Sequence, residues 1–529
     1  MHIFHFRKKD INLFNSQHIN LTNNQGLYKS FINRDFRITN FIDQASDKKI
    51  NYSESHRSVL VSELEKKYFG VNNKDKVMSN IELLKLNNTY TVTTGHQLSL
   101  LTGPLYFIVK IINVIKLADR LNQENKKINI VPVFWMATED HDFEEIQSIN
   151  LYGKKISWDT QQKGPVGRFN LDQFSQIKEQ ILDFFGNNID AEIYDLMKVY
   201  DGKDLAEATF NLVHELFKKY GLVIIDGDNK NFKKMFVSTI ERELKDQFSY
   251  KAVYKTNKDL EKDGFKIQAF AREINLFYIE NGLRQRIEKT GDGFQIKGLG
   301  VYSETEILNK LQLNPECFSP NVVLRPLYQE TILPNLAYIG GGSEISYWLQ
   351  LKGIFDSTNI TYPIIGIRTS IMWIDKLVSK KIDQIDLVLE DLFKEKDTVK
   401  RQFIEHHSSK ELNFDEIDLI ESQLVKKLEK SILSVDSTME RYKNSEIVKL
   451  NKQIEGIKSK LVKLSKENHT KSMKYIDQIY DKLFPNGQMQ ERYSNIFSFC
   501  PDGNISKRID MLYKVINPEK KDFLVIRES

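Results

Sequence analysis

The first residues that could do chemistry lie where a short β-rich run meets a long helical pattern. Thr94, Gly95, His96 and Gln97 end the run, and Gly103 precedes the helix. Open α/β sheets bind ligands beyond the carboxyl ends of their strands, and the free N–H groups at a helix N-terminus attract anions. We therefore expect His96 to contact a phosphate or carboxylate here. The alternative is a turn glycine and a capping threonine, with the histidine bonded locally.

A second cluster, Glu139-Asp140-His141-Asp142, directly follows a predicted strand that ends at Met136. Carboxylates at the end of a strand can bind an amine, a ribose hydroxyl or a metal ion, and Asp140 and Asp142 flank His141 as metal ligands would. The alternative is a cap, in which Asp142 begins a helix. Four consecutive ionisable residues exceed what a cap requires. We favour a ligand, and an amine or hydroxyl contact over a permanently bound metal.

The third cluster combines cations, carboxylates and a run of glycines. Consecutive glycines let the backbone approach a ligand closely and offer N–H donors, although a plain turn can also contain them. Arg368 follows a later buried run and is a further candidate for binding a carboxylate or phosphate. The members of this third candidate site are Arg325, Tyr328, Glu330, Gly341, Gly342, Glu344, Tyr347 and Arg368.

A strand–helix–strand unit must position the first two clusters. Residues 90–94 are β-prone, residues 104–121 repeat apolar side chains every three or four positions, and residues 130–136 form an apolar run. This order predicts a βαβ unit and hence a parallel sheet. Lys110 lies two turns into the helix and could reach the first cluster. If the two strands are neighbours, both clusters face one cleft.

The rest of the chain divides into segments around this unit. A further strand is predicted at 222–225, and β-hairpins are predicted within 265–300. The expected segments are 1–85, N-terminal and helical; 86–150, the first part of the core; 151–215, an insertion; 216–250, a core segment; 251–316, an inserted β-rich domain; 317–373, the last part of the core; 374–483, a helical coiled coil; and 484–529, a tail that packs on the core.

The coiled-coil prediction depends on apolar residues at alternating steps of three and four, with Lys and Glu around them. This heptad seam consists of Ile447, Leu450, Ile454, Ile457, Leu461 and Leu464. A break near Ser445 would join it to an earlier helical stretch as two antiparallel helices. An apolar stripe needs a partner surface. We therefore predict a homodimer through this segment, the alternative being pairing within one chain.

Composition excludes several classes of protein. The 529 residues are 40% hydrophobic and 28% charged, as in soluble globular proteins, and a net charge of +4 gives no reason to expect a nucleic-acid partner. Cys317 and Cys500 are too few for a disulfide framework or a zinc site, and they fit a reducing compartment. Neither a signal peptide nor a membrane-spanning run is present, so we expect a cytoplasmic protein. The standard nucleotide-loop, zinc-protease and serine-hydrolase motifs are absent.

Four sequence blocks share their order and spacing with a known family. They are Thr94-Gly95-His96-Gln97 with Leu101-Thr102-Gly103-Pro104-Leu105-Tyr106; Val131-Pro132-Val133-Phe134-Trp135 with Glu139-Asp140-His141-Asp142-Phe143; Ser319-Pro320-Asn321 with Arg325-Pro326-Leu327-Tyr328-Gln329-Glu330-Thr331; and Pro485-Asn486-Gly487 with Gln490-Glu491-Arg492. Together these blocks resemble the motifs of the BshC family, which is assigned as the cysteine ligase of bacillithiol synthesis.

This resemblance implies a Rossmann-like core related to class I nucleotidyl-transfer enzymes, with inserted connective domains and a coiled coil used for dimerisation. The implied reaction joins cysteine, through its carboxyl group, to the amine of glucosaminyl-malate in the last step of bacillithiol biosynthesis. A free carboxylate needs activation, so ATP-dependent adenylation is expected, with His96 where the class I H-I-G-H signature binds phosphates. A second signature loop of the K-M-S-K-S kind is missing, so ATP use is a hypothesis, and the alternative is a different activating donor.

The resemblance and the clusters together suggest roles. We expect His96, Asp140 and Asp142 to be catalytic, and the other members of the three clusters, with Lys110, to bind substrate or nucleotide. One alternative is a metal-assisted hydrolase or transferase that uses Asp140, His141 and Asp142. Another is a non-enzymatic coiled-coil adaptor, which would explain residues 374–483 but not the polar clusters at the strand ends.

Overall fold

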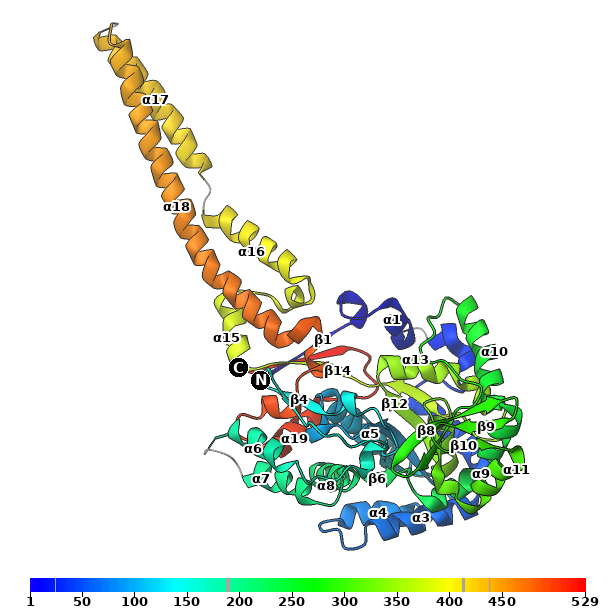
Figure 1. The fold of residues 1–529 in the computed structure, drawn as a ribbon. Helices are drawn as coiled ribbons and strands as arrows, with labels where there is room; N and C mark the ends of the chain where they lie inside the picture. The colour runs from blue at the N-terminus through cyan, green and yellow to red at the C-terminus, as the bar shows by residue number, and fades with distance from the viewer. Residues whose placement is uncertain (24, 187–190, 412–413, 437) are drawn as a thin grey trace.

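Figure 1 shows the computed structural model of the chain, an α/β body from which a pair of long helices projects as an arm. The structure describes residues 1–23, 25–186, 191–411, 414–436 and 438–529. The two termini meet at the base of the arm, where the amino group of Met1 donates to Ser529 Oγ over 3.0 Å. Within the described ranges, no helix is both long and apolar enough to cross a membrane.

The central sheet is parallel throughout, with the strand order β13-β12-β2-β3-β6. Its strands are mostly apolar runs because helices cover parallel sheets on both faces. β2 and β3 are paired along their whole length, so their carboxyl ends lie side by side. The predicted parallel, Rossmann-like core is confirmed. The strands are β2 (Thr89–His96), β3 (Asn129–Met136), β6 (Val223–Asp226), β12 (Asn335–Gly340) and β13 (Ile364–Ile367).

The helix between β2 and β3 is α5 (Tyr106–Glu124), and most of its side chains are buried. It packs against β2 and β3 and also contacts α19 (Ile505–Val515). We expected this helix to begin at Pro104, but it begins two residues later. Pro104 instead forms an antiparallel bridge with Asn495 of the distant tail, and Leu105 N donates to the carbonyl of Ser494 over 2.8 Å.

Two insertions surround the carboxyl edge of the sheet. The first contains a hairpin of β4 (Ser148–Leu151) and β5 (Lys154–Ser157), followed by helices. The second contains an antiparallel sheet of order β10-β9-β8-β7-β11. This sheet includes the β-hairpins that were predicted within residues 265–300. Its strands are β7 (Leu276–Glu280), β8 (Leu283–Thr290), β9 (Gly293–Ile296), β10 (Gly300–Tyr302) and β11 (Phe318–Pro320).

A third sheet joins the two ends of the chain. We expected a mostly helical N-terminal segment, and helices do occupy much of it from Ser16 onward, but the chain begins with the strand β1 (His2–Phe6). This strand pairs antiparallel with β15 (Phe523–Arg527), which in turn pairs parallel with β14 (Ser370–Ile374). Sequence pattern alone could not reveal β1, because its partner lies at the opposite end of the chain. The tail thus packs on the core through β15.

The arm consists of two antiparallel helices, α17 (Asp415–Val435) and α18 (Glu440–Leu483). Lys458 of α18 contacts the carboxylates of Asp418 and Glu421 on α17, which holds the two helices together. The predicted C-terminal coiled-coil segment is confirmed.

The predicted break near Ser445 is wrong, because Ser445 lies inside α18. The chain reverses earlier, where Thr438 N and Thr438 Oγ1 both donate to Asp436 Oδ1 over 2.8 Å. Short polar side chains that bond to the backbone two residues on are typical of turns.

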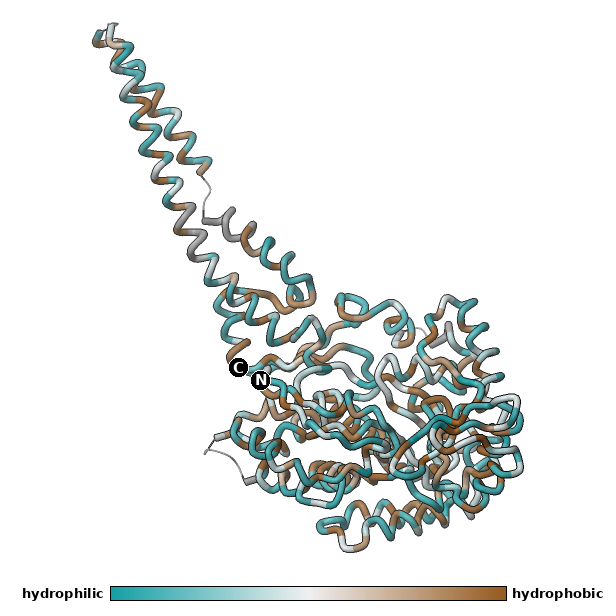
Figure 2. Tube along the Cα trace, viewed as in Figure 1, coloured by the Kyte–Doolittle hydropathy of each residue, from teal (hydrophilic) through white to brown (hydrophobic). Residues whose placement is uncertain are grey.

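Pairing within the chain does not cover all of the apolar surface of the arm. Ile457, Leu461 and Leu464 of the heptad seam are 62%, 41% and 49% exposed. Hydrophobic residues recur along both helices in Figure 2. An uncovered apolar stripe therefore remains on the arm.

The remaining helices cover the central sheet and the insertions or form the base of the arm. They are α1 (Ser16–Asn23), α2 (Phe41–Asn51), α3 (Glu54–Lys67), α4 (Asp75–Leu83), α6 (Ser175–Asp183), α7 (Ala191–Met197), α8 (Leu205–Phe217), α9 (Lys230–Asp246), α10 (Phe248–Lys262), α11 (Glu304–Leu313), α12 (Arg325–Ile332), α13 (Gly342–Gln350), α14 (Lys352–Asp356), α15 (Lys376–Gln384) and α16 (Lys396–Glu411).

Candidate active site

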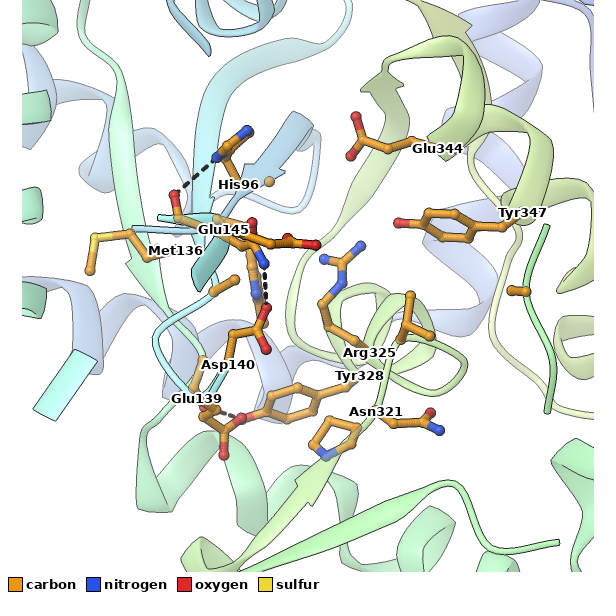
Figure 3. A pocket seen from close by; sticks show the side chains of 18 of the residues that line it. His96, Met136, Glu139, Asp140, Glu145, Asn321, Arg325, Tyr328, Glu344 and Tyr347 are labelled. Atoms are coloured by element: carbon orange, nitrogen blue, oxygen red, sulfur yellow. Dashed lines mark hydrogen bonds between the residues drawn. The ribbon is translucent and has the colours of Figure 1, made fainter. Parts of the chain in front are cut away.

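A cavity of about 790 Å³ opens at the carboxyl ends of β2, β3 and β12. Its walls also include the starts of α12 and α13 and part of the inserted antiparallel sheet. Figure 3 shows His96 and Asp140 on one side of this space and Glu344 and Tyr347 on the other. The predicted site residues that line it are Gly95, His96, Gln97, Lys110, Glu139, Asp140, His141, Arg325, Tyr328, Gly341, Glu344, Tyr347 and Arg368.

His96 ends β2 and is held by two hydrogen bonds. Its Nδ1 lies 3.0 Å from the carbonyl oxygen of Gln97, and its Nε2 lies 3.1 Å from the hydroxyl of Tyr106. A carbonyl oxygen only accepts, so Nδ1 carries the proton and Nε2 accepts from Tyr106. Burial, together with the charge of Lys110, lowers the pKa of His96 to about 4. The imidazole is therefore neutral at pH 7 and is not suited to charge pairing with a phosphate.

Asp140 follows β3 and faces the cavity with an unneutralised charge. Gln97 Nε2 donates to its Oδ2 over 2.8 Å, and His141 N donates to its Oδ1 over 2.8 Å. Among the described residues, its nearest ionisable contact is the His141 ring, 3.8 Å away, and it forms no ion pair with a lysine or arginine. The carboxylate is therefore available to bind an ammonium group.

Asp142 is exposed and lies outside the cavity. It precedes a short helical turn, Phe143–Glu145, but its side chain makes no capping hydrogen bond there. The capping alternative is therefore not supported, and the catalytic role predicted for Asp142 has no geometric support either.

Glu139 lines the cavity, but its charge is balanced within the chain. The buried ammonium group of Lys233 contacts the Glu139 carboxylate and donates to the carbonyl of Phe318 over 2.7 Å. Burial raises the pKa of Glu139, and Lys233 opposes this effect. Glu139 therefore connects β3 to the insertion more directly than it offers charge to a ligand.

Lys110 reaches the cavity as predicted, and there it pairs with Glu344. Its Nζ donates to both carboxylate oxygens of Glu344, over 3.0 and 2.8 Å, and to the carbonyl of Gly95 over 2.6 Å. Gly341 N and the Tyr338 hydroxyl also donate to Glu344. Burial favours a higher pKa for Glu344, but Lys110 and Gly341 outweigh it and hold this pKa at about 2. The pair joins α5 to α13.

Arg325 begins α12, and its guanidinium group projects between Asp140 and Tyr347 in Figure 3. Its Nη1 donates to Gln329 Oε1 over 3.0 Å, and the group lies 5.7 Å from the ring centroid of Tyr338. Unlike Lys110, it has no carboxylate of the described chain within 4 Å. A partly buried cation without a counter-ion is suited to an anionic ligand.

Arg368 also lines the cavity, yet its charge is neutralised by the tail. Its Nη1 and Nη2 donate to the two carboxylate oxygens of Glu491 over 2.9 and 2.8 Å, and both side chains are buried. Glu491 also accepts from Ile371 N on β14. Arg368 therefore joins the core to the tail, and its predicted contact with a phosphate or carboxylate ligand has less support.

Four further predicted site residues lie outside the cavity. Thr94 donates to the carbonyl of Ile339 over 2.7 Å and so joins β2 to β12. Gly103 has φ of 64°, and a Cβ there would lie 2.6 Å from Ser99 Cβ. Thr94 thus links two strands and Gly103 shapes the loop before α5, and neither residue lines the cavity.

Gly342 and Glu330 are also explained by packing. A Cβ on Gly342 would lie 2.1 Å from His18 Nδ1, so the absence of a side chain here leaves room for His18 of the N-terminal segment. Glu330 is buried beside Lys48, 3.6 Å away, and accepts from Asn335 over 2.8 Å. The geometry gives neither residue a ligand contact.

Arginines from the second insertion and the tail line the cavity, although sequence reasoning did not identify them. They are Arg272, Arg284, Arg286 and Arg492. Two of them alternate along β8, a signal of one shared face that the sequence already contained. Their approach to the core depends on how the insertion docks, and no local pattern specifies that.

The metal-assisted alternative lacks a matching ligand set. In the described part of the chain, no group of three or more His, Cys, Asp or Glu side chains is arranged to hold a metal ion. His141 Nδ1 lies 2.9 Å from Arg284 Nη1, so that nitrogen already accepts a hydrogen bond.

A parallel sheet with a charged cavity at its carboxyl edge, followed by a helical hairpin, defines a Rossmann-like α/β enzyme with a coiled-coil domain. Family models give this class a name. Residues 8–369 match "Bacillithiol biosynthesis BshC, N-terminal Rossmann-like domain", and residues 371–528 match "Bacillithiol biosynthesis BshC, C-terminal coiled-coil domain". The chain belongs to the BshC family.

Curated relatives agree with this membership. A protein of Flavobacterium johnsoniae, named "Putative cysteine ligase BshC", is 38% identical over 509 residues, which cover 94% of each chain. Relatives with the same name in Flavobacterium psychrophilum and Staphylococcus carnosus are 39% and 29% identical, over 93% and 79% of this chain and 93% and 81% of theirs. A solved structure described as a "putative arginyl t-RNA synthetase" from Campylobacter jejuni covers 85% of this chain and 99% of its own, at 11% identity and a TM-score of 0.21, which is too low to support an argument.

Proposed function

We propose that this chain is a cytoplasmic ligase that joins the carboxyl group of cysteine to the amine of glucosaminyl-malate, the last step of bacillithiol biosynthesis. One observation carries the proposal: among the described residues, the cavity contains a carboxylate, Asp140, that pairs with no Lys or Arg, and a guanidinium group, Arg325, that pairs with no Asp or Glu. An amide-forming enzyme must hold an amine and a carboxylate together, and these two charges suit that pair of substrates.

The same reaction also needs a group that accepts a proton. The attacking amine must lose a proton as the amide bond forms. The carboxylate of Asp140 lines the cavity and can accept this proton, whereas His96 is a weaker base, because its pKa is lowered to about 4 and its Nε2 already accepts a hydrogen bond from Tyr106. In this scheme Asp140 orients the amine, and Arg325 orients the carboxyl group of cysteine.

The carboxyl group must be activated before an amine can displace one of its oxygens, and we propose ATP as the activating co-substrate. Arg325 and Arg492 line the cavity and form no ion pair within the described residues, so both suit anionic phosphates. Lys110 and Arg368 are already paired with carboxylates and are poorer candidates.

We also propose that the exposed stripe of the arm binds a second copy of the chain. Ile457, Leu461 and Leu464 remain exposed after the hairpin forms, and apolar stripes of this kind are usually buried in assemblies. Sedimentation should show a dimer at micromolar concentration, and replacing Ile454 and Ile457 by Lys should produce monomers. A wild-type monomer would mean that the apolar residues of the heptad seam need no partner surface beyond the hairpin itself.

The function is tested by deleting the gene and measuring small thiols by mass spectrometry. We expect bacillithiol to disappear and glucosaminyl-malate to accumulate, because the last step is lost. Re-expression of the intact chain is the control. Normal bacillithiol in a deletion strain without a second copy of the gene would contradict the proposal.

A further inference from the structure

Arg284 is fixed in the cavity wall by neutral groups alone. It lies on β8 of the inserted antiparallel sheet, where its Nε donates to Ser319 Oγ and its Nη2 to the carbonyl of Pro320, both over 3.0 Å. Its Nη1 donates to His141 Nδ1 over 2.9 Å, and the guanidinium group lies 4.0 Å from the ring centroid of Phe277. These contacts fix the direction of the group without cancelling its charge.

The lack of a counter-ion distinguishes Arg284 from the buried lysine nearby. Lys233 meets the carboxylate of Glu139 directly. Glu139 and Asp140 influence Arg284 electrostatically, but no carboxylate of the described residues lies within 4 Å of it. A desolvated cation that lacks a partner is costly, and an anion that enters the cavity would remove that cost.

Further cations lie on the same wall. Arg286, two residues along the strand, also lines the cavity, as does Arg272 in the segment before β7. Neither forms an ion pair within the described chain. The acidic groups that line the cavity without a Lys or Arg partner, Asp140 and Glu145, come instead from the core, just after β3. The carboxylates of the cavity that lack a Lys or Arg partner therefore come from the core, and the ionisable groups that the insertion contributes to the lining are all cations, in addition to Arg325 of the core and Arg492 of the tail.

This separation of charge matches one substrate of the proposed reaction. In glucosaminyl-malate the amine lies on the sugar carbon next to the one that bears malate, so the amine and two carboxylates are only a few bonds apart. Carboxylates bind guanidinium groups through charge-assisted, often bidentate hydrogen bonds. An amine at Asp140 would thus place the malyl carboxylates toward the insertion.

We propose that Arg284, assisted by Arg286 and Arg272, binds the malyl carboxylates of the acceptor, so that the inserted β-rich sheet determines which amine is accepted. This inference rests on the proposed function. It gives the insertion a specific task, which is to distinguish an acceptor with a dicarboxylate tail from the same amino sugar without one.

The test compares the affinity of the full-length protein for two acceptors by calorimetry: glucosaminyl-malate and methyl glucosaminide, which lacks the malyl group. We expect the wild-type protein to prefer glucosaminyl-malate, and Arg284→Gln to weaken its binding by about 10- to 100-fold. Arg284→Lys should recover part of the affinity, because lysine keeps the positive charge but not the two parallel N–H donors of the guanidinium group. Lys289→Gln is the matched control, since Lys289 lies on the same strand and does not line the cavity.

The phosphates of ATP are a second source of negative charge that Arg284 could bind, so the affinity for ATP is measured as well. Arg284→Gln should leave the affinity for ATP unchanged. The melting temperature shows whether each variant folds, and Arg286→Gln, which changes an exposed side chain, provides a second variant if Arg284→Gln is unstable. An equal loss of affinity for both acceptors, or a loss of affinity for ATP alone, would overturn the inference. Unchanged binding of glucosaminyl-malate by the variants would overturn it and leave the proposed function intact. No binding of glucosaminyl-malate to the wild-type protein would overturn both.

Discussion

The core–tail joint, formed by Arg368 and Glu491, and the cavity at the strand ends both contain charged side chains, but the charges are balanced differently in the two places. At the joint, Arg368 and Glu491 neutralise each other through two hydrogen bonds. In the cavity, Asp140, Arg284 and Arg325 are held by neutral groups and form no such pair within the described residues. Charged groups that pair with each other within the chain hold its elements together. Charged groups without an ion-pair partner are available to bind a ligand.

Breaking the joint should produce the largest effect on stability. Glu491→Gln removes the negative charge and leaves Arg368 buried without a counter-ion, which should reduce the free energy of unfolding by about 3–5 kcal/mol. Urea unfolding or the melting temperature measures this loss. Glu455→Gln, which alters an exposed contact with Lys458 on the arm, should change stability by at most about 1 kcal/mol. Equal effects of the two variants would show that the joint is not held by its ion pair.

A smaller effect is expected from His96 when the pH falls. The pKa of His96 is about 4 in the folded protein, below its ordinary value of about 6.5, because burial and Lys110 disfavour the charged form. The unfolded chain therefore binds a proton more readily between pH 6.5 and 4. Stability should decline across this window by up to about 3 kcal/mol.

The variant His96→Gln isolates that contribution. Its melting temperature should fall less between pH 6.5 and 4 than that of the wild-type protein. Some decline should remain, because burial also lowers the pKa of His18, to about 3. The same pH dependence in both proteins would mean that His96 is not held neutral at the end of β2.

The sequence was sufficient for features that depend on local pattern. The apolar runs and the amphipathic repeats predicted the parallel strands, and adjacency of β2 and β3 then placed His96 and Asp140 at one cavity. The patterns could not show which charges are satisfied, because the partners are distant in sequence. Lys110 meets Glu344 and Arg368 meets Glu491 only after the whole chain has folded.

The same limit explains the residues that were missed. Arg284 belongs to a separate insertion, and its place beside His141 follows from the docking of that insertion on the core. The strand β1 was missed for a related reason, since its partner β15 is at the far end of the chain. Residues such as Glu330 were over-interpreted, because a buried structural ion pair and a ligand contact use the same residue types.

The central claim is that the open charges in the cavity serve the reaction. Asp140→Asn tests it most directly, because the change preserves the shape of the side chain while it removes the charge and one of the two acceptor oxygens. The measurement is the initial rate at which bacillithiol accumulates after the variant is induced in a deletion strain, with the melting temperature of the purified protein as control. Loss of one charge-assisted hydrogen bond corresponds to about 1.5–3 kcal/mol, so we expect the rate to fall by at least about tenfold at an unchanged melting temperature. A wild-type rate, or a rate that falls only in step with stability, would contradict the account.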